Sequence, residues 1–544
     1  MHALMLYPIF PKSYWSFEKA LKLAGRKVLM PPLGLITAAA ILPQKWEYKL
    51  VDRNIRDVTE DDWEWADLVL LSGMIVQSAD FLALIKEAKK RGKKVVVGGP
   101  YATTLPQEPL DAGADYLVLD EGEFTIPMFL EALENGEQTG TFRAPEKPDL
   151  TTTPIPRFDL LELDAYSEMA IQFSRGCPFL CEFCDIIVLY GRRPRTKSPQ
   201  QFIDELQCLY DMGWRRTIFV VDDNFIGNKR KVKEVLRMLV PWMEKLNYPF
   251  SFGTEASIDL AKDQELMDLM TAANFGTVFI GIETPDEESL AGTRKTQNLN
   301  QSLVESVHKI ALSGLRVMAG FIIGFDEEKT GAGERIVQFT EDASIPTAMC
   351  SMLQALPNTA LWHRLEKEGR LGNETADGNQ MTLLNFIPNR PIEEIGEEYV
   401  NAFWDLYDPQ RYLDRTYQHY LMLGKASCHK ERKKKKFKTK EKVSWKEKRQ
   451  YIKAAFSIGF KQGLLRKTRF TFWSYLWSMY RQNPGGVVSY LTVCAQIDHF
   501  LEYRQIIKTE IEYHLRTQAT MPTEIKNPSL GDASSIKHAE ALEK

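Results

Sequence analysis

Short, nearly continuous apolar runs recur through the first 140 residues of the chain. Runs of this kind are typical of strands that are buried on both faces of a parallel sheet. There are five of them, at residues 2–10, 48–54, 68–74, 94–101 and 116–122. Between the third and the fourth, residues 78–92 carry apolar side chains at helical spacing and end at Gly92. Strands that alternate with helices predict a doubly wound, Rossmann-like parallel sheet, an α/β fold, for residues 1–140.

The alternation stops at residues 141–165, which are rich in proline and threonine, and resumes over residues 166–360. The interval has no apolar periodicity and is predicted to be a linker. Six further strand-like runs follow it, at residues 169–174, 217–224, 250–257, 277–284, 317–325 and 348–356. Six βα units predict a partial (β/α)6 barrel, three-quarters of the eight-stranded one and open on one side. Side chains that carry chemistry are expected at the carboxyl ends of its strands.

The pattern changes again after residue 360, and residues 361–544 are predicted to form a mainly helical C-terminal extension. A dense basic run interrupts it at 429–449, and an aromatic run follows at 470–480. Because like charges repel, a solvated connector is one interpretation of the basic run. Electrostatic contact with anionic lipid is the other. An aromatic run suits a membrane interface and a buried helix alike, so peripheral membrane contact through 429–480 stays open.

Length and composition describe a multidomain globular chain. It has 544 residues, of which 44% are hydrophobic and 26% charged. The net charge of −4 gives no reason to expect nucleic acid as a partner. The longest apolar runs are too short to span a bilayer. Seven cysteines, an odd number, without a visible export signal favour a reducing compartment. We therefore expect a cytoplasmic protein, with a peripheral position at the membrane as the open alternative.

Three cysteines, Cys177, Cys181 and Cys184, follow the first barrel strand with the spacing C-x3-C-x2-C. A structural zinc ion would need a fourth ligand, but Cys208 lies in a helical pattern and His2 is the only histidine in the first 300 residues. A disulfide is disfavoured in a reducing compartment. Three thiolates on a four-iron cluster leave one iron open, which is typical of a catalytic site rather than a structural one.

With the aromatic Phe183 before the last cysteine, at the head of six βα units, this spacing resembles the radical S-adenosylmethionine (SAM) superfamily. The resemblance implies a 4Fe-4S cluster held by the three cysteines, whose fourth iron is chelated by SAM. It also implies SAM contacts at the cluster and at the following strand ends: Phe183, Asp222, Asp223, Glu255, Gly281, Ile282 and Glu283. The family's usual Gly-Gly-Glu is absent. For each carboxylate alone, capping of a helix N-terminus is the alternative role.

A doubly wound domain before such a barrel resembles the cobalamin-binding domain of the cobalamin-dependent branch of that superfamily. The resemblance implies corrin contacts in loops at the carboxyl ends of its strands: Asn54, Gly73, Gly98, Gly99, Pro100, Glu121 and Gly122. Asn54 stands where many cobalamin proteins place a cobalt-ligating histidine, so we expect the lower axial face to lack a protein imidazole. A nucleotide-binding or purely structural sheet is the alternative, although no G-x-G-x-x-G follows the first strand.

The two resemblances together predict a cobalamin-dependent radical SAM methyltransferase that acts on an unactivated carbon and receives electrons from a flavodoxin or ferredoxin. About the first 500 residues resemble the subgroup of bacterial hopanoid C-2 methylases, which implies a hopanoid or another polycyclic lipid as the small-molecule or lipid substrate. A non-methylating radical rearrangement and a non-catalytic iron–sulfur or cobalamin sensor are the alternatives. Methylthio transfer would need a second cluster, but no cysteine precedes Cys177.

Overall fold

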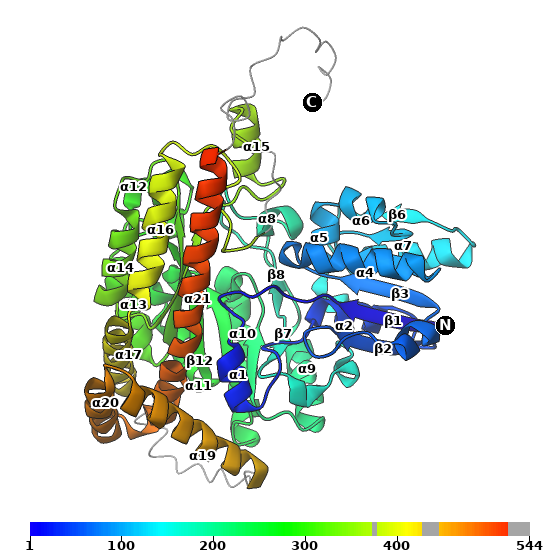
Figure 1. Ribbon diagram of the computed structural model, residues 1–544. Helices are drawn as coiled ribbons and strands as arrows, with labels where there is room; N and C mark the ends of the chain where they lie inside the picture. The colour runs from blue at the N-terminus through cyan, green and yellow to red at the C-terminus, as the bar shows by residue number, and fades with distance from the viewer. Residues whose placement is uncertain (373–377, 427–444, 521–544) are drawn as a thin grey trace.

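Two six-stranded parallel sheets form the frame of the molecule (Figure 1). The computed structural model describes residues 1–372, 378–426 and 445–520. The first sheet has the order β2-β1-β3-β4-β5-β6. Its strands are β1 (His2–Tyr7), β2 (Glu47–Asp52), β3 (Leu68–Ser72), β4 (Lys94–Gly98), β5 (Tyr116–Val118) and β6 (Gly140–Phe142). The five predicted strands are all present and all pair in parallel.

Helices cover both faces of this sheet, as predicted. They are α2 (Leu33–Ile41), α3 (Glu60–Trp65), α4 (Ser78–Lys90), α5 (Gly99–Thr104), α6 (Gln107–Asp111) and α7 (Gly122–Glu134). Strand β1 shows why both faces are apolar, since successive side chains point to opposite faces. Leu4 and Leu6 pack with α3 and α4, whereas Ala3 and Met5 pack with α2 and α7.

The sixth strand, β6, differs from the sequence-based prediction. It pairs with β5 through Gly140, Thr141 and Phe142, so the first two residues of the predicted linker belong to the sheet. The rest of the interval contains three short 3-10 helices, at Leu150–Thr152, Phe158–Leu160 and Leu163–Ala165.

The second sheet has the order β14-β13-β12-β11-β10-β7, and all its pairs are parallel. Its strands are β7 (Met169–Ile171), β10 (Thr217–Val220), β11 (Ser251–Ala256), β12 (Phe275–Glu283), β13 (Arg316–Ile323) and β14 (Thr347–Met352). In the described part of the chain β7 and β14 do not pair, so the sheet is an open, partial barrel as predicted.

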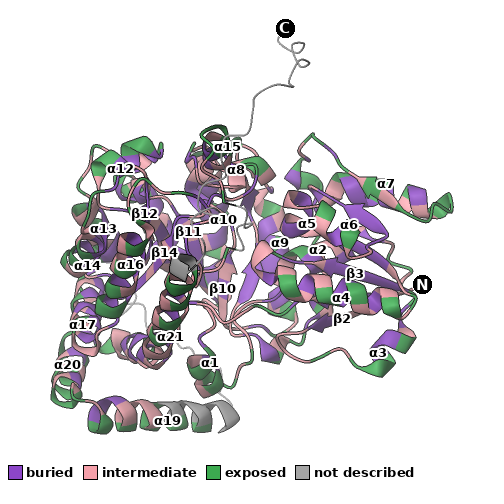
Figure 2. Cartoon of the chain, turned by 45° about the horizontal axis from the view of Figure 1, so that its top comes forward, coloured by how far each residue is buried: buried purple, intermediate pink, exposed green. Residues whose placement is uncertain are grey.

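Helices alternate with these strands on the outside of the partial barrel. They are α9 (Pro199–Asp211), α10 (Lys229–Lys245), α11 (Gln264–Ala272), α12 (Glu287–Gly292), α13 (Leu303–Ser313) and α14 (Ala332–Asp342). Between β7 and α9 the chain forms a small antiparallel hairpin, β8 (Ser174–Arg175) with β9 (Arg195–Thr196), and a short helix, α8 (Ile186–Leu189). The strands of both sheets are the most completely buried part of the molecule (Figure 2).

The C-terminal extension is helical where the structure describes it. Its helices are α15 (Ala360–Lys367), α16 (Ile392–Leu406), α17 (Pro409–Gly424), α19 (Trp445–Phe460), a π-helical turn (Lys461–Leu465), α20 (Arg469–Gln482) and α21 (Val487–Thr520). They pack on α13, α14 and β14. Most of the predicted basic connector, 429–444, lies outside the described residues, and its end, 445–449, begins α19. Within the described chain, we find no helix long and apolar enough to cross a membrane.

The segment between β1 and α2 leaves the first sheet and reaches the barrel and the C-terminal helices. Its helix α1 (Glu18–Ala24) packs on α19 and α21. Just before this helix, the buried Tyr14 hydroxyl lies 2.6 Å from the hydroxyl of Tyr407, and Trp15 packs edge-on against Phe279 of β12. The segment between β1 and α2 therefore joins the first sheet to the barrel and to the C-terminal helices.

Candidate active site

The three clustered cysteines lie in the loop of the β8–β9 hairpin, residues 176–194, called the cluster loop below. Gly176 opens the loop with a φ of 93°, and a side chain there would come within 2.7 Å of the Gly191 carbonyl oxygen. The Cys177 N–H donates a hydrogen bond of 3.2 Å to that carbonyl. Only glycine allows this close approach, so the loop is held shut at its base.

The environment of the thiols combines burial with one nearby cation. Burial raises the pKa of the Cys177 thiol, and burial together with Asp185 raises that of Cys184. Lys295 forms a 2.5 Å ion pair with Glu283. Burial alone would lower the pKa of Lys295, but Glu283 and the sulfur of Cys181 raise it to about 12. A permanent positive charge therefore lies beside the sulfurs, where it favours their ionised, metal-binding form.

Two amide side chains point at the sulfurs. Gln297 Nε2 lies 3.6 Å from Cys181 Sγ, and Asn224 Nδ2 lies 3.9 Å from Cys177 Sγ. Hydrogen bonds to thiolates are one means by which a protein sets the potential of an iron–sulfur cluster. Among the described residues, no three Cys, His, Asp or Glu side chains gather around the position of one metal ion. A cubane does not require this, because each thiolate binds a different iron.

The neighbouring carboxylates Asp222 and Asp223, after β10, have different surroundings. Asp222 is fully buried and accepts hydrogen bonds from the backbone N–H of Phe173 (2.7 Å) and of Ser174 (2.8 Å), and from the Ser174 hydroxyl (2.6 Å). Both of its oxygens thus fix the start of the hairpin. Oδ2 of Asp223 is buried without a partner, and burial together with the charge of Asp222 raises the pKa of Asp223 to about 7. Asp223 is therefore the one of the two that is free to bind a ligand.

The ends of β11 and β12 contribute the remaining predicted SAM residues. Burial and the nearby Asp223 raise the pKa of Glu255 to about 8, and no donor among the described residues bonds to its carboxylate. Glu283 adopts a φ of 65°, and a side chain at Gly281 would lie 2.4 Å from the Glu283 carboxylate. Gly281 thus makes room for the Glu283–Lys295 ion pair. Ile282 is buried, so only its backbone can meet a ligand.

Phe183 and its neighbour Glu182 link the cluster loop to later parts of the chain. The Phe183 ring lies 5.9 Å from that of Phe325, and the Lys295 ammonium lies 5.9 Å from the Phe183 ring centre. Glu182 forms a 2.8 Å ion pair with Arg364 of α15. Phe183 therefore packs against the barrel beside the cysteines, and the neighbouring Glu182 connects the cluster loop to the C-terminal extension.

The glycines predicted to contact a corrin lie at the carboxyl ends of β3 and β4. Gly99 has a φ of 85°, and a side chain there would come within 2.3 Å of the Ser72 hydroxyl. A side chain at Gly98 would come within 2.8 Å of a carbonyl of β5, and one at Gly73 would touch Phe81 at 3.0 Å. Pro100 lies in the first turn of α5. Glycine is therefore required at these positions by close packing within the first domain and, at Gly99, by the backbone conformation.

The Asn54 side chain is hydrogen-bonded to residues of the first domain. Its side-chain nitrogen donates to the Pro8 carbonyl (3.1 Å) and to Asp52 (2.8 Å), and its oxygen accepts from the Phe10 N–H (2.9 Å). The amide therefore ties the loop after β1 to the loop after β2. His2 lies at the opposite, amino end of β1.

Glu121 and Gly122, predicted as corrin contacts, lie where the first domain meets the cluster loop. Glu121 is buried and forms ion pairs with Arg175 (2.8 Å) and Arg195 (2.7 Å). These two arginines lie opposite each other on the two strands of the β8–β9 hairpin. Glu123 adds a second ion pair to Arg175 (2.9 Å). These four charged side chains, called the interdomain clasp below, fasten both strands of the hairpin to the start of α7. Gly122 lies in its first turn, packed against α7's own side chains.

Sequence reasoning missed several of these polar residues. Lys295 and Gln297 lie between α12 and α13, in the connection that follows β12, and Arg175 and Arg195 flank the cluster loop. The available signal was the polar character of loops that follow barrel strands, since active groups in such barrels collect there. No local motif marks these four residues.

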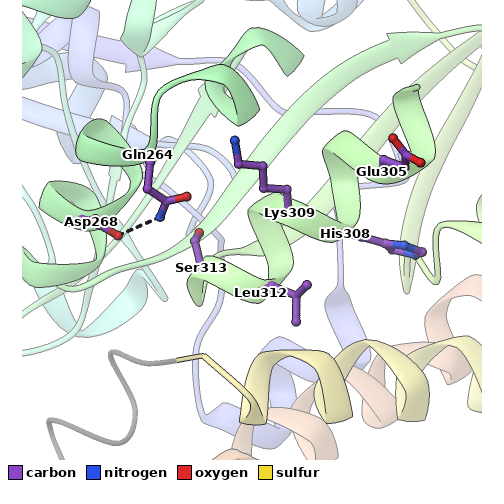
Figure 3. A pocket seen from close by; sticks show the side chains of 7 residues that line it. All are labelled: Gln264, Asp268, Glu305, His308, Lys309, Leu312 and Ser313. Atoms are coloured by element: carbon purple, nitrogen blue, oxygen red, sulfur yellow. Dashed lines mark hydrogen bonds between the residues drawn. The ribbon is translucent and has the colours of Figure 1, made fainter. Parts of the chain in front are cut away.

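One surface depression lies away from this region, between α11 and α13 (Figure 3). Its volume is about 370 Å³, and Gln264 donates a hydrogen bond to Asp268 at its rim. It is on the outer side of the barrel helices and shares no residue with the cluster loop, so it takes no part in the site.

Comparison with known proteins identifies three regions of the chain. Residues 23–130 match the B12 binding domain, and residues 171–339 match the Radical SAM superfamily. Residues 359–513 match a domain of unknown function, DUF4070. The first two matches contain the glycine-rich edge and the cluster loop, respectively.

Relatives cover most of the chain. An uncharacterized methyltransferase of Synechocystis sp. is 60% identical over 517 residues, 95% of this chain and 94% of the relative. The hopanoid C-2 methylase of Rhodopseudomonas palustris is 36% identical, over 76% of this chain and 78% of the relative. Among solved structures, the radical SAM methyltransferase TsrM from Kitasatospora setae has the same fold, with a TM-score of 0.58 at 17% identity over 84% of this chain and 99% of TsrM. The radical enzyme OxsB gives 0.56 at 14% identity over 97% of this chain and 84% of OxsB.

The cluster loop and the two matched domains define a radical SAM enzyme with a cobalamin-binding domain. The chain belongs to the cobalamin-dependent radical SAM methyltransferase family. Its cofactors are a 4Fe-4S cluster, SAM and cobalamin, as the sequence predicted. Residues of this chain fit the cluster and SAM: three thiols lie close together with amide donors aimed at two of the sulfurs, and a buried oxygen of Asp223 has no partner among the described residues.

Proposed function

We propose that this enzyme methylates an unactivated carbon of a polycyclic, largely apolar substrate such as a hopanoid. The observation that carries the proposal is the apolar character of the face where the two domains meet. Large apolar side chains are exposed in the loops after β1 and β3 and in the cluster loop, which includes α8: Ile9, Phe10, Met74, Leu180 and Val188. Figure 1 places α8 and β8 between the barrel and the first sheet. The similarity to the hopanoid C-2 methylase supports the same substrate class.

The residues of the site take the following roles in this proposal. Cys177, Cys181 and Cys184 hold the cluster. Asp223 and Glu255 bind the positively charged methionine moiety of SAM, since neither carboxylate has an ion-pair partner within the described chain and the two would otherwise repel each other. When bound, the cluster and SAM supply the radical chemistry and cobalamin the methyl group, while the protein supplies orientation and excludes water.

Other residues of the site contact the cofactors through their backbone or hold the loops that carry these contacts. The backbone of Gly281–Glu283 flanks the adenine, and Gly73, Gly98, Gly99 and Pro100 receive the corrin. Asp222 and Asn54 position the loops that carry these groups. An electron donor of the flavodoxin or ferredoxin type reduces the cluster. The enzyme works in the cytoplasm, with peripheral contact to a membrane through residues 429–480, of which 445–480 are described.

The test is expression in a hopanoid-producing host that lacks its own methylase, followed by mass spectrometry of the lipid extract. The expected product is a hopanoid heavier by one methylene, with the added carbon on ring A. A host that expresses the Cys184→Ala variant is the control and should give unmethylated lipid. An unchanged profile from an enzyme that still cleaves SAM would overturn the lipid substrate and leave the family assignment in place.

A further inference from the structure

One end of the C-terminal extension exposes an unusual number of large apolar side chains. They belong to α19, the π-helical turn and α20, and they are called the aromatic platform: Phe456, Phe460, Leu464, Leu465, Phe470, Trp473, Trp477 and Tyr480. Phe456 and Phe470 are each 75% exposed, and Trp477 is 63% exposed. Single exposed apolar residues are ordinary, but a contiguous patch of this kind marks an interaction surface.

The platform side chains recur at helical spacing. Phe456, Phe460 and Leu464 are four residues apart, and Phe470, Trp473, Trp477 and Tyr480 are three or four apart. Each set therefore lies on one face of its helix. The buried side chains of α20, Phe472 and Met479, lie on another face, toward the protein. A helix that faces only solvent would carry polar residues at its outward positions. In α20 the outward positions are apolar as well, so one apolar face is covered by the protein and the other is exposed.

The two halves of the platform are joined at one point. The indole N–H of Trp473 donates to the Gly463 carbonyl (2.9 Å), and a side chain at Gly463 would lie 2.6 Å from the Trp473 ring. Gly463 thus lets α20 pack directly on the π-helical turn. Because α19 and α20 both pack on this turn, their exposed side chains lie on either side of it.

The charged residues of the segment that carries the platform are all basic. From Lys453 to Gln482 the chain has six basic residues and no acidic one. Lys461 and Arg466 are neutralised by Asp498 of α21. The other four are exposed and have no acidic partner within the described chain: Lys453, Lys467, Arg469 and Arg481.

We infer that the aromatic platform binds the surface of a bilayer that contains anionic lipid, an inference that rests on the peripheral contact included in the proposed function. Tryptophan, tyrosine and phenylalanine favour the headgroup region, and the unpaired basic residues match the phosphate charge. A second copy of this chain is a poorer occupant, because it would bring like charges together.

The position of the platform fixes how the enzyme would lie on the bilayer. In Figure 1, α19 and α20 are at the lower end of the molecule, whereas α8, which is part of the cluster loop, and α15, which pairs with that loop, are in the upper half. Figure 2 gives the same arrangement from another angle. The platform therefore holds the enzyme at the membrane without forming part of the active site, and membrane binding and catalysis are separable.

The test is flotation of the full-length holoenzyme with phosphatidylcholine vesicles, with and without phosphatidylglycerol. We expect binding only to the anionic vesicles, and we expect it to weaken as salt is added. Each basic residue near an anionic surface contributes about fivefold to binding, so Lys467→Ala with Arg469→Ala should bind roughly 25-fold more weakly. Trp477→Ser should also weaken binding. Tyr513→Ser is the matched control, since Tyr513 is an exposed aromatic residue on α21 outside the platform, and it should bind as the wild type does.

Equal vesicle binding by the platform variants and the wild type would overturn the inference, as would no binding at all. Self-association that the platform variants abolish would instead make the platform an interface between copies of this chain. SAM cleavage, measured in the same preparations, should be unchanged in every variant and shows that each is folded. Because methylation of a detergent-dispersed substrate does not require vesicles, failure of membrane binding is distinguishable from failure of the proposed function.

Discussion

The interdomain clasp should determine how firmly the cluster loop is held, and Glu121→Gln tests this with almost no change in shape. Glu121 is the only clasp member that contacts both strands of the hairpin among the described residues, through Arg175 and Arg195. Burial alone would lower the pKa of Arg175, but Glu123 and Glu121 raise it. The substitution therefore takes a buried counter-ion away from both arginines.

The expected cost follows from the partners that remain. Removing one member of a buried ion pair typically costs about 3–5 kcal/mol. Here Arg175 keeps Glu123, and Arg195 keeps the carbonyls of Pro148 (2.8 Å) and Tyr190 (3.2 Å). We therefore expect about 2–3 kcal/mol, below the usual range. Since about 1.4 kcal/mol is a factor of ten, local opening of the hairpin should increase roughly 30- to 150-fold.

Hydrogen exchange of the apoprotein, followed by mass spectrometry, measures this opening. Peptides that cover residues 174–197 should exchange faster by that factor in Glu121→Gln, because opening precedes exchange. Glu60→Gln is the matched control: Glu60 also pairs with an arginine, Arg91, but at an exposed site where an ion pair contributes little. If these peptides exchange in Glu121→Gln as slowly as in the wild type and the control, the clasp does not hold the cluster loop.

Three further predictions concern single residues. Replacing any one of the three cluster cysteines by alanine should abolish SAM cleavage in product assays, whereas Cys208→Ala, in a helix outside the cluster loop, should retain it; activity in a cluster variant would refute the ligand assignment. Gly99→Ala should lower the cobalamin content of the purified protein at least about tenfold. The control is Gly136→Ala: Gly136 also has a positive φ but has open space around it, so this variant should lose only about 1–2 kcal/mol of stability and keep its cobalamin. The raised pKa of Glu255, about 8 against 4.5 in the unfolded chain, makes the apoprotein less stable as pH rises between these two values. Glu255→Gln should therefore reduce the fall in unfolding temperature between about pH 5 and about pH 8; an unchanged slope would exclude Glu255 as its cause.

Most of the strand pattern was predictable because it depends on local sequence. Continuous apolar runs identified all six strands of the barrel and five of the first sheet. Strand β6 was missed since Gly140–Phe142 is three residues long, lies at the sheet edge and exposes Thr141. Such a segment buries too little apolar surface to leave a signal in the sequence.

The different roles of Asp222 and Asp223 could not be predicted from the two-residue period of a strand, because β10 ends at Val220 and Asp223 already lies in a turn. Their surroundings depend on which parts of the chain the fold brings to this strand end. Glu255, in contrast, lies within β11 between the buried residues Thr254 and Ala256, so the alternation of a strand does apply to it.

The contacts that hold the two cofactor domains together could not be predicted, because their partners are far apart in the sequence. Glu121 and Arg195 are 74 residues apart, and Tyr14 and Tyr407 are 393 apart. Neither Tyr14 nor Arg195 belongs to a periodic pattern, so their burial depends wholly on tertiary structure. In the folded chain the clasp and the segment around Tyr14 fasten the first sheet to the barrel at two separate places. A single attachment would leave a hinge between the sheet and the barrel, whereas two attachments restrict rotation. The glycine edge of the first sheet and the cluster loop are therefore held at a fixed separation. Transfer between two bound cofactors and one substrate requires such fixed positions.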